Sequence, residues 1–107
     1  MRTHQEIEAR SLAMHRLIAE RIRRDPALLG RVRATLVRWL LEVSTRARPE
    51  LEEWLQVVDR GLDATLALAT EDSDRAATLR QSSPFVGILT SRERFEFLRE
   101  WRARHAA

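Results

Sequence analysis

The stretch Ser82-Ser83-Pro84-Phe85-Val86-Gly87-Ile88-Leu89-Thr90 divides the C-terminal part of the chain into two pieces. Serine followed by proline indicates a helix break, and the apolar run at 85–89 is predicted either as one helical turn or as an extended arm. Thr90 and Glu93 then form a capping box, which predicts a last helix over residues 91–104.

Similar signals upstream define the first two helices. Thr3 and Glu6 form another capping box, which starts the first helix. Asp25-Pro26 ends that helix, because residues before proline disfavour helical geometry, and it also suits the start of the next helix. Apolar residues recurring every three or four positions extend this second helix from about residue 26 to residue 45.

The middle of the chain predicts two further helices. Apolar spacing favours one continuous helix over residues 49–69, although Gly61 lies inside it. A polar interruption at 70–74 precedes a short helix that ends near Gln81. Strand-like alternation of useful length is absent from the sequence. We therefore expect one all-α domain spanning residues 1–107, a small bundle of four to five helices that forms a homodimer.

Composition places the chain among globular proteins rather than disordered ones. Of its 107 residues, 44% are hydrophobic and 33% are charged. There is no cysteine, which excludes disulfides and thiolate metal sites. No segment approaches the roughly 18 consecutive apolar residues of a membrane helix. We expect a cytoplasmic protein without a membrane partner.

Charge is distributed in three blocks. Residues 1–48 hold eleven arginines and five acids (net +6), residues 49–74 hold one arginine and eight acids (net −7), and residues 75–107 hold seven arginines and three acids (net +4). All nineteen basic residues are arginine, which forms bidentate bonds with carboxylates or phosphates. We expect the blocks to neutralise one another within one fold or between copies of it.

Catalytic and metal-binding patterns are weak, so we expect a protein that is not an enzyme and holds no cofactor. The three histidines, His4, His15 and His105, lack the spacing of metal ligands and are expected to be ordinary surface or core residues. Arg10 with His15, and Arg99 with His105, match the loose Arg-x4–6-His pattern of HEPN ribonucleases. Such matches arise by chance in so arginine-rich a chain, and a HEPN-like ribonuclease is therefore only a second alternative function.

Nucleic-acid binding is the first alternative function. The two helices joined at Asp25-Pro26 carry arginines that suit phosphate contacts, with Arg31, Arg33 and Arg38 as the candidates. The second helix has few side chains that read bases, so a DNA-binding transcriptional regulator is possible but not favoured.

Protein recognition is the favoured function, through a partner-binding C-terminal segment at 82–107. Aromatic residues interspersed with arginine are the composition of interface hot spots. Phe95 and Phe97 lie on different sides of the predicted last helix, so this helix is either sandwiched within the domain or presents one side to a partner. The candidate contact residues are Ser82, Ser83, Phe85, Val86, Ile88, Leu89, Arg92, Phe95, Phe97 and Trp101.

Three phrases carry a resemblance to a known family: RSLAMHRLIAE at 10–20, DPALL at 25–29 and LRQSSPFVGILT at 79–90. Together they resemble small helical bacterial antitoxins paired with nucleotidyltransferase-like toxins, the MenA/MenT and AbiE-related group. The resemblance implies a cognate toxin that transfers nucleotides onto tRNA ends. It also implies that this chain neutralises the toxin by direct contact. Our own expectation is that the C-terminal segment occludes the active site of the toxin.

Overall fold

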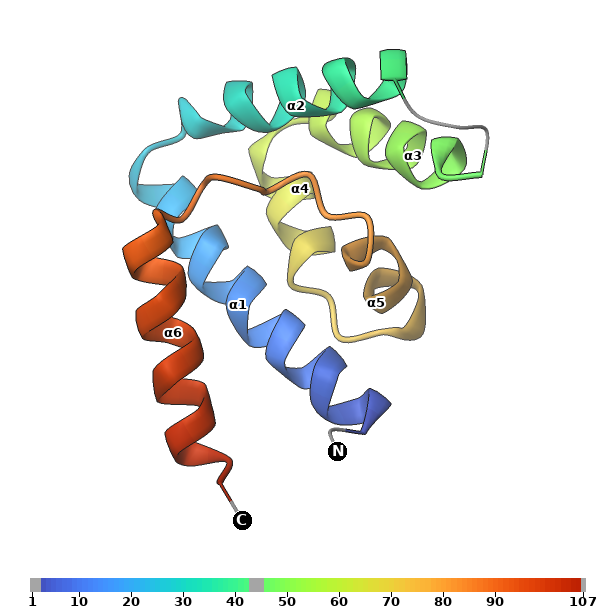
Figure 1. The fold of residues 1–107 in the computed structure, drawn as a ribbon. Helices are drawn as coiled ribbons and strands as arrows, with labels where there is room; N and C mark the ends of the chain where they lie inside the picture. The colour runs from blue at the N-terminus through green and yellow to red at the C-terminus, as the bar shows by residue number, and fades with distance from the viewer. Residues whose placement is uncertain (1–2, 43–45, 107) are drawn as a thin grey trace.

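Six α-helices form the computed structural model of the chain, which describes residues 3–42 and 46–106 (Figure 1). The helices are α1 (His4–Arg24), α2 (Leu28–Glu42), α3 (Arg48–Asp59), α4 (Leu62–Ala69), α5 (Asp74–Arg80) and α6 (Ser91–Arg104). The described residues contain no strand. The all-α prediction is confirmed, with six helices in place of four to five. The predicted end of the second helix, at 43–45, lies outside the described residues.

Both predicted capping boxes form. The hydroxyl of Thr3 accepts a hydrogen bond from the Glu6 N–H (3.1 Å), and the Glu6 carboxylate accepts one from the Thr3 N–H (3.1 Å). Thr90 and Glu93 repeat the arrangement at the start of α6. These local bonds satisfy backbone donors that every helix start leaves free, so both helix starts were readable from sequence.

Gly61 corrects the prediction of one helix over 49–69. Its φ of 116° lies in a region that side-chain-bearing residues rarely adopt, and it is the N-cap of α4. The chain bends there, so that α3 packs beside α2 while α4 turns to meet α1. The apolar spacing continued across the bend because both helices face the same core, and it therefore concealed the break.

The core lies between the α2–α3 pair and α1, with α4 at its centre and α5 packed on α1 and α4. The segment at 81–90, orange in Figure 1, crosses the middle of the molecule and contributes Phe85 and Ile88 to this core. It is neither a helix nor a straight arm. The Ile88 N–H donates to the Phe85 carbonyl (3.2 Å), which closes a turn.

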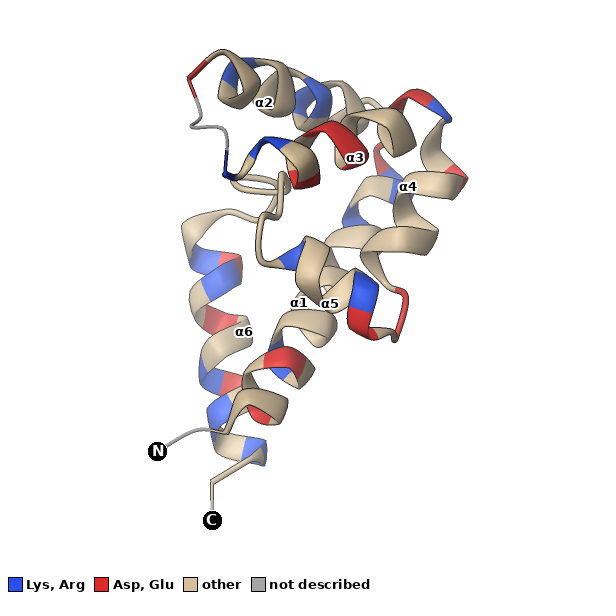
Figure 2. Ribbon diagram, turned by 90° about the vertical axis from the view of Figure 1, so that its right-hand side faces the viewer, with Lys and Arg blue, Asp and Glu red and all other residues tan. Residues whose placement is uncertain are grey.

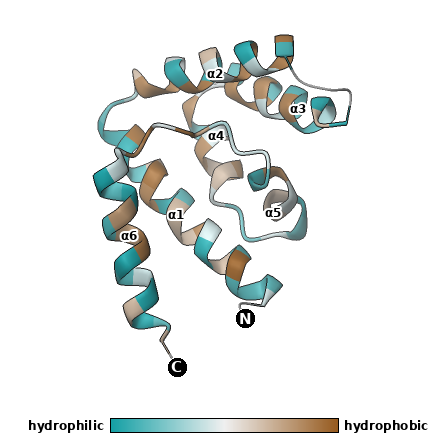
Figure 3. Cartoon of the chain, viewed as in Figure 1, coloured by the Kyte–Doolittle hydropathy of each residue, from teal (hydrophilic) through white to brown (hydrophobic). Residues whose placement is uncertain are grey.

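Helix α6 lies along α1 at the edge of the molecule (Figure 1). Its buried side chains, Phe97 and Trp101, are outside the main core cluster. Phe97 shares a cleft with Ala13 and Leu17 of α1. Most of the ribbon of α6 is hydrophilic in Figure 3, so this helix is attached along one side only.

Ion pairs connect the three charge blocks. Figure 2 shows the charged residues distributed over the helices. Arg33–Asp59 (2.8 Å) joins the first basic block to the acidic block, Glu53–Arg75 joins the acidic block to the last block, and Arg21–Glu93 joins the first block to the last. Part of the expected neutralisation between blocks therefore occurs within a single copy of the chain.

Candidate functional site

Phe85 occupies the interior rather than the surface. Its side chain is 2% exposed and makes edge-to-face contacts with the rings of Trp54 (centroids 5.4 Å apart) and His15 (5.6 Å). Trp54 is fully buried, and its indole N–H donates to the Leu79 carbonyl (2.8 Å). Phe85 therefore joins the 81–90 segment to α1 and α3.

Several other predicted contact residues also stabilise the fold itself. Ile88 belongs to the main core, and Phe97 and Trp101 are buried on the α1 side of α6. With Phe85, they are inaccessible to a partner in this conformation. Ser82, Ser83 and Leu89 are half-buried. The accessible members of the predicted set are thus Arg92, Val86 and Phe95.

The outer face of α6, defined here as Arg92, Phe95, Arg99 and Arg102, points away from α1. Spacings of three and four residues place these side chains on one side of the helix. Phe95 is 65% exposed. Arg92 pairs with Glu96 (3.2 Å), whereas Arg99 and Arg102 are exposed and form no ion pair with any described residue. An exposed aromatic ring is therefore flanked by guanidinium groups.

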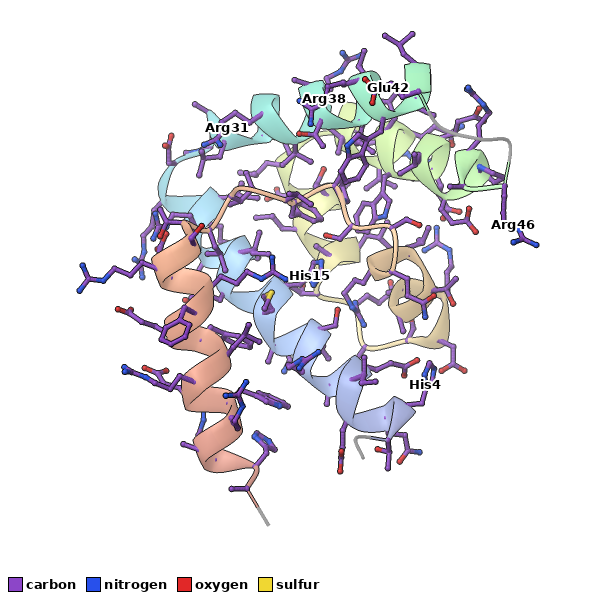
Figure 4. All side chains as sticks on the ribbon, viewed as in Figure 1. His4, His15, Arg31, Arg38, Glu42 and Arg46 are labelled. Atoms are coloured by element: carbon purple, nitrogen blue, oxygen red, sulfur yellow. The ribbon has the colours of Figure 1, made fainter. Side chains whose placement is uncertain are left out.

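The candidate nucleic-acid contacts do not form one free basic surface. Arg33 donates to the Asp59 carboxylate, which raises the pKa of Arg33 and lowers that of Asp59 through the same hydrogen bond. Arg31 donates to the Gly87 carbonyl (3.3 Å). Arg38 is exposed and has no hydrogen bond to a described residue; Figure 4 shows Arg31 and Arg38 along α2. Two of the three arginines thus have partners within the fold, an arrangement that does not favour the DNA-binding alternative.

His15 and Ser83 form a partly buried polar contact that the sequence did not predict. Nδ1 of His15 lies 2.7 Å from the Ser11 carbonyl, and Nε2 lies 2.8 Å from Oγ of Ser83. A carbonyl only accepts, so Nδ1 carries the proton of the neutral ring and Nε2 accepts from the Ser83 hydroxyl. Figure 4 shows His15 in the middle of the molecule. His15 lies three residues after Leu12 and three before Ile18, both of which are buried. This helical spacing is the feature of the sequence that could have indicated a buried ring at position 15.

The protonation state of His15 follows from its surroundings. Burial lowers the pKa of His15 below its ordinary value of 6.5, and the nearby Arg80 charge acts in the same direction, while the bond to the Ser11 carbonyl opposes both. The ring is therefore neutral at pH 7, with Nε2 available as a hydrogen-bond acceptor.

Ser83 also borders an apolar cavity of about 550 Å³. Trp39 of α2, Leu51 of α3 and Val86 supply apolar wall, and the side chains of Ser82 and Ser83 supply hydroxyl groups. This volume falls within the roughly 300–1,000 Å³ typical of small-molecule sites. A second cavity of about 380 Å³ is lined by both His15 and Ser83, so Ser83 borders both spaces.

Neither of the two Arg-x4–6-His matches forms an open site in which arginine and histidine meet. Both ring nitrogens of His15 are hydrogen-bonded within the fold. His105 stacks on Trp101 with ring centroids 3.8 Å apart, and its Nδ1 bonds to the Trp101 carbonyl. Neither histidine is paired with an arginine in a shared open site, and the geometry gives the ribonuclease alternative no added support.

Within the described part of the chain, no cluster of three or more potential metal-ligating side chains occurs. None of its helices has the length and apolar character needed to cross a membrane.

No protein-family model, curated protein or solved structure matches the chain.

Proposed function

We propose that this chain is an antitoxin-like protein that binds and neutralises a cognate nucleotidyltransferase-like toxin by direct contact. The observation that carries the proposal is the outer face of α6, where Phe95 is 65% exposed between arginines. Aromatic and arginine side chains are enriched at protein interfaces and dominate their binding hot spots, and this face of α6 presents both.

Electrostatics define the partner surface that fits this face. Arg99 and Arg102 have no carboxylate partner among the described residues, so both are available for an acidic surface. A nucleotidyltransferase holds its metal ions with carboxylates, and arginine recognises such groups with bidentate hydrogen bonds. We place α6 over the mouth of the toxin's active site, where it excludes nucleotide and tRNA by occlusion.

Co-expression tests this function. The neighbouring gene is expected to encode the toxin, and this chain should restore growth that the toxin inhibits. Phe95→Ala should weaken binding about 30-fold, equivalent to about 2 kcal/mol for a hot-spot side chain, and Arg99→Glu should also weaken it. Ile7→Ala, an exposed apolar position on α1 (45% exposed), is the matched control and should bind normally.

The proposal fails if the wild-type protein forms no complex with the neighbouring gene product. It also fails if Phe95→Ala and Ile7→Ala bind equally well, because the contact then lies elsewhere. Circular dichroism of each variant checks that its helices remain intact.

We also propose a homodimer formed through α2. Val37 and Leu41 are 38% and 84% exposed and, four residues apart, share one side of that helix. Sedimentation equilibrium should give twice the monomer mass, reduced by Leu41→Asp. A monomer at every concentration tested would refute this assembly.

A further inference from the structure

We propose that Ser83 and His15 form a nucleophile–base pair that hydrolyses small uncharged esters with an apolar acyl group. Their atoms are already in hydrogen-bond contact, with Oγ of Ser83 2.8 Å from Nε2 of His15. A serine hydroxyl becomes nucleophilic when an adjacent base accepts its proton and a third group orients that base. All three parts are present here, although the residues are 68 positions apart in the chain.

The Ser11 carbonyl positions the base. It accepts from Nδ1 of His15 at 2.7 Å, which fixes the tautomer whose Nε2 lone pair faces the Ser83 hydroxyl. In the established serine–histidine–aspartate arrangement a carboxylate has this orienting role. A neutral carbonyl fixes the ring less strongly, so we expect slower chemistry than in those enzymes. The edge-to-face contact with Phe85 further holds the imidazole plane.

Ser83 is half-buried and borders both cavities, whereas His15 lines the one of about 380 Å³. The ester would therefore lie with its acyl group in the 550 Å³ cavity and its alcohol towards the cavity that His15 lines, where Nε2 can reach the leaving oxygen. The walls formed by Trp39, Leu51 and Val86 suit an apolar acyl group, and Glu42 disfavours an anionic one. These features define the substrate class as an uncharged ester.

The reaction proceeds in two balanced steps. Oγ of Ser83 bonds to the ester carbonyl carbon, Nε2 of His15 takes the hydroxyl proton, and that proton leaves with the alcohol when its C–O bond breaks. Water then attacks the acyl carbonyl carbon while Nε2 of His15 takes a proton from it. That proton passes to Oγ of Ser83 as the bond between Oγ and the acyl carbon breaks and the acid departs. Ester and water thereby become acid and alcohol, with no other reactant required.

Backbone donors for the developing oxyanion are available at the same wall. The N–H groups of Ser83 and Val86 donate to no described group, and both residues border the substrate cavity. The nucleophile's own N–H contributes to the oxyanion hole in chymotrypsin-like enzymes. The Phe85 N–H, by contrast, approaches Oγ of Ser83 (3.4 Å) and stabilises its position.

A fluorophosphonate probe tests the site in the full-length protein. Incubation at pH 7.5 should add one probe per chain, and peptide mass spectrometry should locate it on Ser83. His15→Gln, which retains a hydrogen-bonding side chain, should slow labelling about 100-fold or more. Thr35→Ala removes a hydroxyl of α2 that borders neither cavity and should label at the wild-type rate. Hydrolysis of p-nitrophenyl butyrate should follow the same order.

Two results would overturn the assignment. One is a folded wild-type protein whose Ser83 stays unmodified while a serine esterase reacts under the same conditions. The other is ester hydrolysis that survives Ser83→Ala, which would place the activity on another group such as an exposed histidine. Because the site uses none of the residues of the outer face of α6, neither result bears on toxin binding.

Discussion

Replacing Phe85 by alanine tests whether the 81–90 segment holds the fold together. The ring is 2% exposed and contacts the Trp54 and His15 rings edge to face. Loss of a buried phenylalanine costs about 3–5 kcal/mol, because transfer free energy and packing are both lost. A single domain is stable by only about 5–15 kcal/mol, so Phe85→Ala should lose a large share of the free energy of unfolding.

Urea unfolding followed by circular dichroism measures this loss. With a slope of about 1.5 kcal/mol per M for a chain of this size, the midpoint should fall by about 2–3 M. Phe95→Ala is the matched control: the same substitution at a 65% exposed position should change stability by less than about 0.5 kcal/mol. A loss of less than about 1 kcal/mol for Phe85→Ala, or a loss no larger than that for Phe95→Ala, would contradict a role of Phe85 in holding the fold together.

Three further predictions concern the backbone, a buried histidine and a buried arginine. Gly61→Ala should destabilise the folded state by about 1–2 kcal/mol, because φ is 116° at this position, although an added Cβ would meet no other atom. Gly30→Ala lies inside helix α2, where an added Cβ also meets no atom. It should therefore stabilise the fold by about 0.5–1 kcal/mol in the same urea assay. The pKa of His15 is lowered on folding, so the unfolded chain takes up the proton first; stability should fall as pH drops below 6.5, and His15→Gln should reduce this pH dependence. Arg80 donates through Nη1 to the Ala69 and Glu71 carbonyls at the end of α4. Arg80→Met removes both hydrogen bonds and should lower the free energy of unfolding by about 2 kcal/mol. An unchanged melting temperature would contradict a stabilising role for these bonds.

Features set by neighbouring residues were predictable from the sequence. The capping boxes at Thr3 and Thr90 depend on a residue three positions away, and both formed where expected. The break at Asp25 was also predicted, although α2 starts at Leu28 rather than at residue 26, because a turn closed by the Leu28 N–H and the Asp25 carbonyl precedes it.

Features set by the meeting of distant segments were not predictable. Apolar spacing gave no sign of the bend at Gly61, since helices on either side share one core. On α6, the spacing showed that Phe95 and Phe97 occupy different sides, but only the position of α1 determines that Phe97 is the buried one. The His15–Ser83 contact joins α1 to the 81–90 segment, and no local pattern specifies such a pair.

Calorimetric titration of the purified pair measures whether the outer face of α6 binds the proposed toxin. We predict that the wild-type chain binds the nucleotidyltransferase-like product of the neighbouring gene, and that Phe95→Ala raises the Kd about 30-fold while Ile7→Ala leaves it unchanged. An absence of binding by the wild-type chain, or an equal Kd for all three proteins, would contradict the claim.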